Sequence, residues 1–214
     1  ISATQTAEAI RRLPAAVTLG FAPYGADVRK LTAEARAAGH EILLQVPMEP
    51  FDYPDNDPGP QTLLTSVASA QNLDRLHWHM SRFAGYVGLM PFMGARLVAD
   101  DAALRTVLDD AAHRGLGYFD DGRAARSVAP QLAAASALPF ARADLVLDKV
   151  AAAGDIDAAL AALERLARQN GTAIGSAGVA PVTVERIAGW AKTLAAHGIT
   201  LVPLTTAMLK SKSS

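Results

Sequence analysis

The sequence predicts an α/β fold: a distorted parallel barrel of about seven strands with helices outside it. Short runs rich in Val, Ile and Leu alternate with longer segments of helical periodicity, a pattern typical of βα units around a parallel sheet. The chain has 214 residues, which suits one generous domain. We therefore expect a single domain over residues 1–209, and a disordered tail over 210–214, where the sequence is charged and serine-rich.

Seven apolar runs are the expected strands, and four segments between them have apolar side chains on one helical stripe. Glycines stand just after three of these helical segments and act as stop signals. The expected strands cover residues 16–22, 41–46, 86–90, 116–119, 143–147, 172–175 and 199–204, and the helical segments cover 27–38, 100–113, 155–169 and 183–196.

The chain opens on a further helical segment, for which Ser2 or Thr4 can serve as the N-cap and which ends at Pro14. No strand precedes this helix, although a parallel barrel normally begins with one. We therefore expect the first strand of the barrel to lie upstream of Ile1 in the gene product.

Composition excludes several classes of protein. Half of the residues are apolar, which indicates a folded chain. The 20 Lys and Arg nearly balance the 21 Asp and Glu, and no basic stripe is present, so we expect no nucleic-acid partner. The absence of cysteine removes disulfides, thiolate zinc sites and a Cys nucleophile. Gly and Pro interrupt the longest uncharged stretches, so no membrane span is expected, and the first residues lack the features of a secretion signal.

Active sites of parallel α/β folds lie beyond the carboxyl ends of the strands, so the loops there are the places to expect chemistry. The loop over residues 45–60 is long and rich in Pro and Asp. Within it, Glu49 has Pro50 on one side and Pro47 close by on the other, so its carboxylate is held in place. Such a carboxylate can be a base, an acid or a metal ligand. The alternative is a rigid surface excursion whose carboxylates are only solvated.

Two further loops carry acidic and basic side chains. Asp120 and Asp121 follow the fourth run, and because neighbouring strand residues face opposite ways, we expect one to face the site and the other to cap the next helix. Asp148 follows the fifth run and needs a cationic partner, which Arg142 or Arg123 can supply. Purely structural pairs are the alternative for both loops.

The remaining polar features carry less information. Ser176 lies in a glycine-rich turn after the sixth run, where the backbone could approach a ligand, although a tight turn explains the glycines equally well. His77 and His79 stand two apart in a helical segment and therefore face different ways, which makes a poor metal pair. We expect structural roles for all five histidines.

Several segments taken in order resemble the divergent polysaccharide deacetylase family, a distant branch of the NodB-like carbohydrate esterases. The most specific part is Gly-His-Glu followed by Pro-Met-Glu-Pro in and after the second run. The segments are VTLGFAPYG, AGHEILLQVPMEP, GPQTLL, GYVGLMPFMGARL, a strand that ends in Asp121 before SVA, RADLVLD and GTAIGSAGVAPVT.

The resemblance implies a NodB-like barrel and, in ordinary members, a divalent metal such as zinc. One aspartate and two histidines hold this ion, a second aspartate accepts a proton from the metal-bound water, and a later histidine is the general acid. The two metal histidines match Gln45 and Glu49 here, and the acid lies near Ser176. Zinc prefers imidazole or thiolate ligands, so Gln45 and Glu49 are weak metal candidates and we expect no tightly bound zinc.

Two functions follow from the resemblance and stay open. The first is a hydrolase that removes N- or O-acetyl groups from a cell-envelope carbohydrate. The second is a catalytically degenerate barrel that binds a glycan or an envelope partner without hydrolysis. A periplasmic or envelope-associated location is implied for both. The candidate catalytic residues are Glu49, Asp121, Arg142 and Asp148, and the candidate substrate-binding residues are Gln45, Met48, Arg123 and Ser176.

Overall fold

A computed structural model describes residues 2–210, and its centre is a parallel five-stranded sheet. The strands follow one another in sequence order, and every neighbouring pair is parallel. Two further short strands, later in the sequence, pair in parallel with each other and form a second sheet. The large sheet contains β1 (Leu19–Phe21), β2 (Ile42–Met48), β3 (Gly88–Met93), β4 (Gly117–Asp120) and β5 (Phe140–Arg142), and the pair is β6 (Leu145–Val146) with β7 (Gly175–Ser176).

One segment of backbone pairs with both sheets in turn. Directly after β5, the Ala143 N–H donates to the carbonyl of Asp120 in β4, and the next N–H, of Asp144, donates to the carbonyl of Ile174 just before β7. The backbone therefore leaves one sheet and joins the other within two residues. Among the described strands, β1 and β7 do not pair with each other, so the expected closed barrel is not confirmed.

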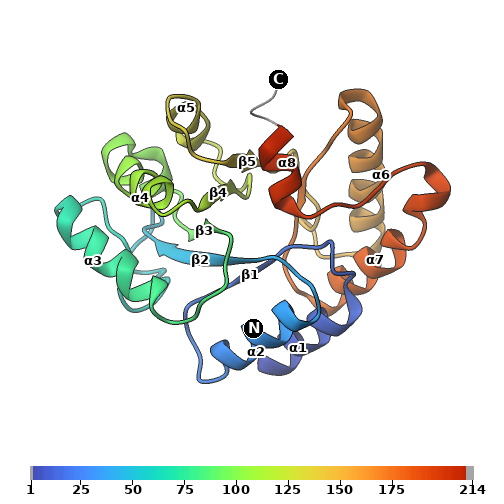
Figure 1. Cartoon of the computed structure of the whole chain (residues 1–214), viewed down its shortest axis with the longest axis horizontal. Coiled ribbons are helices and arrows are strands. Elements are labelled where there is room, and N and C mark those ends of the chain that lie inside the picture. The colour runs from blue at the N-terminus through green and yellow to red at the C-terminus, as the bar shows by residue number, and fades with distance from the viewer. Residues whose placement is uncertain (1, 211–214) are drawn as a thin grey trace.

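Except for the last helix, which lies beside β5, the helices lie around the outside of the strands, as Figure 1 shows, and several of their starts and stops agree with the sequence signals. Ser2 caps the first helix in a capping box with Gln5, and Asp100 caps the fourth. Gly39 and Gly198, each just after a helical segment, have left-handed φ angles of 90° and 68° that favour glycine. The helices are α1 (Ala3–Arg12), α2 (Val28–Ala37), α3 (Ser69–Met80), α4 (Asp101–His113), α5 (Ala129–Ala134), α6 (Ala153–Asn170), α7 (Pro181–Ala191) and α8 (Leu204–Lys210), with 3-10 turns at Leu97–Ala99 and Leu194–His197.

Three of the expected strands need correction, and the one expected over 172–175 is only the short β7, at Gly175–Ser176. Residues 199–204 form no strand, because Pro203 has no N–H to donate and the segment runs instead into α8. There, the Leu204 N–H donates to the hydroxyl of Thr18, and the Thr205 N–H donates to the carboxylate of Glu41. The expected strand over 143–147 is only the short β6, and β5 just before it was not expected. The expected tail lies outside the described residues, except for position 210.

The hydrophobic core has two parts, one on each face of the large sheet. The larger part packs the sheet against the helices and includes Leu44, Leu89 and Tyr118. The smaller part lies on the opposite face, where Met208 of α8 packs with Leu43 and Phe119. Strand alternation explains this division, because successive side chains face opposite ways.

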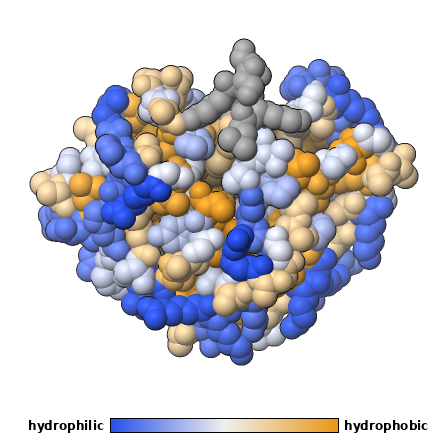
Figure 2. Space-filling view, viewed as in Figure 1, coloured by the Kyte–Doolittle hydropathy of each residue, from blue (hydrophilic) through white to orange (hydrophobic). Residues whose placement is uncertain are grey.

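Apolar and polar side chains are both visible at the surface. On the face drawn in Figure 2, hydrophobic residues are visible toward the middle, and hydrophilic residues are frequent around the periphery. Within residues 2–210, no helix has the length and apolar character needed to cross a membrane.

Candidate functional site

Charged side chains gather in two clusters at the carboxyl ends of the strands. We call the first the Arg123 cluster; its members are Asp121, Arg123, Asp148 and Ser176, which follow or end β4, β6 and β7. We call the second the Glu49 cluster; its members are Glu49, Thr65 and Arg96, which come after β2 and β3.

The Arg123 cluster joins the two sheets. The Arg123 guanidinium donates to Asp148 Oδ1 at 3.0 Å, and its Nε lies 3.8 Å from Asp121 Oδ2. Asp148 Oδ2 accepts from the N–H of Gly178 at 2.7 Å, and the Ser176 hydroxyl donates to the carbonyl of Asp121 at 2.7 Å. The guanidinium is half-exposed beside these largely buried carboxylates, so it keeps N–H donors available to solvent.

Asp121 has an altered acidity. Burial raises the pKa of its carboxyl group, the neighbouring Asp120 charge raises it further, and Arg123 opposes both effects. Carboxyl groups with raised pKa values are frequent at functional sites, because they can exchange protons nearer neutral pH. Asp121 therefore combines a position just after a strand with a raised pKa.

The Glu49 cluster is more tightly closed. Glu49 Oε2 accepts from the N–H of Thr65 at 2.6 Å and from its hydroxyl at 2.8 Å. Glu49 Oε1 lies 3.5 Å from the Arg96 guanidinium, and the Glu49 carbonyl accepts from the N–H groups of Arg96 and Leu97. The Glu49 side chain is only 6% exposed, whereas Arg96 is half-exposed. Glu49 therefore holds two loops together and presents Arg96 at the surface.

Of the two possible partners of Asp148, Arg123 pairs with it and Arg142 pairs with Asp120 instead. The Arg142 Nε lies 3.6 Å from Asp120 Oδ2, and the two residues are register partners on β5 and β4. Asp120 Oδ1 accepts from the Gly122 N–H, so Asp120 closes a turn and does not cap a helix. The structure thus brings Asp121 and Asp148 together through Arg123, and it gives Arg142 and Glu49 other partners.

Gln45 and Met48, the two other expected substrate-binding residues on β2, have different surroundings. Gln45 lies beside Gly20, where an added Cβ atom would stand 3.3 Å from Gln45 Nε2 and 2.6 Å from Met90 Sδ. Gly20 therefore makes room for the Gln45 side chain. Met48 is fully buried in the larger part of the core, so it has no exposed surface to offer a ligand.

The long loop after β2 is also anchored at its far end. His79 of α3 is buried, and its Nε2 lies 2.8 Å from the carbonyl of Gln61. Burial lowers the pKa of His79 to about 4, so the ring is neutral at pH 7 and Nε2 donates to that carbonyl. The Tyr24 hydroxyl donates to the carbonyl of Pro60 at 2.6 Å. Side chains from distant parts of the sequence therefore fix this loop.

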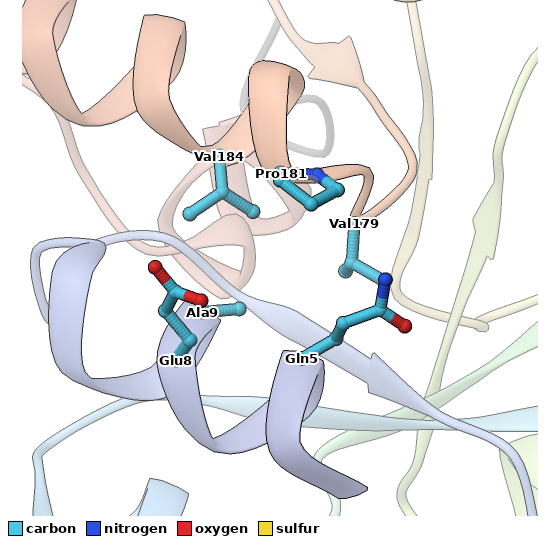
Figure 3. A pocket seen from close by; sticks show the side chains of 6 residues that line it. All are labelled: Gln5, Glu8, Ala9, Val179, Pro181 and Val184. Carbon is cyan, nitrogen blue, oxygen red and sulfur yellow. The ribbon is translucent and has the colours of Figure 1, made fainter. Parts of the chain in front are cut away.

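Two hollows are lined by residues that belong to neither cluster. A cavity of about 10 Å³ between α1 and α7 is lined by Ala9, Val179 and Val184, among others, and Figure 3 shows its residues. That volume suits about one water molecule. An open depression of about 440 Å³ lies beside Leu194 and Ile199.

Comparison with known proteins decides the family. The model of the family described as divergent polysaccharide deacetylase matches residues 2–208. The chain belongs to this family. The match confirms the resemblance found in the sequence.

A solved structure supports the fold of this divergent polysaccharide deacetylase domain, and two further relatives match its sequence. A crystal structure of the uncharacterized protein ATU2773 from Agrobacterium tumefaciens is 40% identical, with a TM-score of 0.94, and the match covers 97% of this chain and 84% of that chain. An uncharacterized protein of Haemophilus influenzae is 23% identical over 82% of this chain, and the uncharacterized protein YibQ of Escherichia coli is 22% identical over 81%. The chain spans less than two thirds of these two relatives, 62% and 54% of their lengths.

The divalent metal that the NodB-like resemblance implies does not fit the described residues. Among residues 2–210, no three His, Asp or Glu side chains gather in a group that could hold a metal ion. The positions that match the metal histidines are Gln45 and Glu49, and both oxygens of the Glu49 carboxylate face other partners. Ser176, near the position of the acid, donates to a carbonyl.

Thr65 and Arg96 were not expected as site residues. Thr65 lies 16 residues from Glu49 in the sequence, and nothing local links the two. Arg96 lies in the segment GYVGLMPFMGARL, just after a strand, so its position beyond β3 was the signal available.

Proposed function

We propose that this domain binds an acetylated carbohydrate of the cell envelope at the Arg123 cluster, without metal-dependent hydrolysis by the described residues. The observation that carries the proposal is the half-exposed Arg123 guanidinium, which Asp121 and Asp148 fix at the carboxyl ends of the strands. Guanidinium N–H groups donate to hydroxyl and acetyl oxygens, and fixed donors lose little freedom on binding.

The residue types at the matched positions support binding over hydrolysis. Gln45 and Ser176 stand at or near positions where the resemblance implies histidines. Neither side chain exchanges protons near neutral pH, and an amide oxygen is a weak zinc ligand. An envelope location for this domain is part of the same proposal and rests on the family resemblance.

Hydrolysis is the second candidate function, and one observation favours it. The raised pKa of Asp121 is the kind of change that prepares a carboxyl group for proton transfer. In that case Asp121 would take a proton from a water molecule that attacks the acetyl carbonyl carbon. It would then return this proton to the sugar nitrogen or oxygen as the bond between that atom and the carbonyl carbon breaks, which releases acetate and the free amine or alcohol.

Calorimetric titration with a tetramer of N-acetylglucosamine tests the binding proposal. We expect the chain to bind the tetramer and Arg123→Ala to weaken binding at least about tenfold, or roughly 1.4 kcal/mol. Arg105→Ala is the matched control, because Arg105 is also half-exposed but pairs with Asp101 on α4. Equal affinities in all three proteins would contradict the proposal.

Acetate release from the same tetramer separates the two functions. We expect none above background, with or without added zinc. Release that disappears in Asp121→Asn but persists in Asp101→Asn would favour hydrolysis instead.

A further inference from the structure

The exposed apolar side chains of the molecule are unevenly placed. Among the described residues, four large hydrophobic side chains remain exposed. Three of them lie at or after the carboxyl ends of strands: Phe51 after β2, Met93 at the end of β3, and Val150 after β6. The fourth, Val202, lies elsewhere. Scattered exposed residues need no explanation, but these three accompany the two charged clusters.

Phe51 and Met93 each lie close in the chain to one member of the Glu49–Arg96 pair. Phe51 is 57% exposed and follows Glu49 after a single intervening residue. Met93 is 41% exposed and comes shortly before Arg96. The register pairs Met48 with Met93, so the ends of β2 and β3 are level. The two apolar side chains therefore lie at neighbouring strand ends, on the same edge as Arg96.

The backbone at the end of β3 is held in an uncommon conformation. Met93 has a left-handed φ of 59°, which a residue with a side chain rarely adopts. Gly94 follows with a φ of 82°, and a Cβ atom there would stand 2.7 Å from the Met48 Cβ atom. After this tight turn, the Arg96 N–H donates to the Glu49 carbonyl. The turn thus fixes Arg96 relative to Glu49.

We infer that Phe51, Met93 and Arg96 form a second sugar subsite, so that the ligand is an oligosaccharide with units at both clusters. This inference rests on the proposed function at the Arg123 cluster. A pyranose ring has an apolar C–H face and a polar edge of hydroxyl and acetyl oxygens. Phe51 supplies an aromatic surface for the face, and Arg96 supplies donors for the edge.

The charge of the subsite favours a neutral sugar. Glu49 balances the charge of Arg96 at 3.5 Å, so the pair offers hydrogen-bond donors with little net charge. An anionic sugar would gain little from this pair, because its charge would face the Glu49 carboxylate as well as the guanidinium. Neutral sugar units, without carboxylate or phosphate groups, are therefore the class that fits, and N-acetylglucosamine is such a unit.

Dependence of affinity on ligand length tests the inference. Calorimetric titrations use the dimer and the tetramer of N-acetylglucosamine with the unchanged chain, Phe51→Ala, Phe51→Trp and Arg123→Ala. We expect the unchanged chain to bind the tetramer about tenfold more tightly than the dimer. Phe51→Ala should abolish this difference while keeping the affinity for the dimer, and Phe51→Trp should retain it. Val202→Ala is the control, because it removes an exposed apolar side chain elsewhere.

The outcomes distinguish the two proposals. Equal affinity for both lengths in the unchanged chain, or a length effect that survives Phe51→Ala, overturns the second subsite and leaves the proposed function intact. Absence of binding to either oligomer overturns both. Loss of dimer binding in Phe51→Ala also overturns the inference, because it would place Phe51 at the primary site.

Discussion

The Glu49 cluster and the Arg123 cluster contain similar residues, but their carboxylates have different numbers of hydrogen-bond and ion-pair partners. In the Glu49 cluster one buried carboxylate meets a backbone N–H, a hydroxyl and a guanidinium. In the Arg123 cluster two carboxylates share one guanidinium, and burial raises the pKa of Asp121. The first arrangement stabilises loops, whereas the second retains a charge that the fold does not fully compensate.

The difference indicates a division of roles along one edge of the molecule. A fully partnered buried carboxylate contributes to stability, and removing it leaves donors without acceptors. An under-compensated carboxylate lowers stability, and such groups are typical of functional sites. Substitutions in the two clusters should therefore have opposite effects on folding.

The largest expected effect is at Glu49. Glu49→Ala should lower the free energy of unfolding by about 3–4 kcal/mol, because it leaves Thr65 and Arg96 without their acceptor. Urea unfolding measures the change. Glu8→Ala is the control, because Glu8 forms an exposed pair with Arg12 and its loss should cost less than about 0.5 kcal/mol. A loss as small as that of the control would mean that Glu49 does not hold the loops.

Much of the fold was predictable because its signals are local. The helix starts at Ser2 and Asp100 and the stops at Gly39 and Gly198 depend on neighbouring residues alone. The segment 199–204 was wrongly predicted because an apolar run is a strand only if another strand pairs with it, and the sequence does not show that partner.

The candidate site was predictable only in part, for a similar reason. The proximity of Asp121, Asp148 and Arg123 was predictable because strand ends in a parallel sheet meet at one edge. The choice of partner within that edge depends on register and on loops that are distant in sequence. Arg142 therefore pairs with Asp120 across β4 and β5, and Glu49 pairs with Thr65, and the sequence indicates neither pairing.

A smaller effect, dependent on pH, is expected at His79, which holds the long loop that follows Glu49. The pKa of His79 is about 4 in the folded chain and 6.5 when unfolded, so the unfolded chain binds the proton first as pH falls. Neutral His79 therefore makes its whole contribution to the free energy of unfolding above pH 6.5. This contribution is lost as pH falls toward 4, which lowers the free energy of unfolding by about 2–3 kcal/mol.

Unfolding experiments between about pH 7 and pH 4 measure this loss. The stability of the unchanged chain relative to His79→Gln should fall over that range, because glutamine keeps a donor for the Gln61 carbonyl but does not titrate. His113→Gln, at the end of α4, is the control for the loss of an imidazole elsewhere in the chain. A constant difference between the unchanged chain and His79→Gln would contradict the prediction.

The smallest effect, and the one with the opposite sign, is expected at Asp121. Its folded pKa is raised, so the folded chain binds the proton more tightly than the unfolded chain does. The resulting stability is present at low pH and is lost as pH rises through the folded pKa, so the ionised carboxylate is destabilising at neutral pH.

Asp121→Asn removes that charge and keeps an oxygen to accept from the Arg123 N–H, so it should be up to about 1 kcal/mol more stable at neutral pH. Urea unfolding at neutral and at acidic pH should show this advantage shrinking as pH falls, whereas Asp101→Asn on α4 should show no advantage. If Asp121→Asn is instead destabilised at neutral pH as Glu49→Ala is, the two clusters have the same structural role and the contrast between them fails.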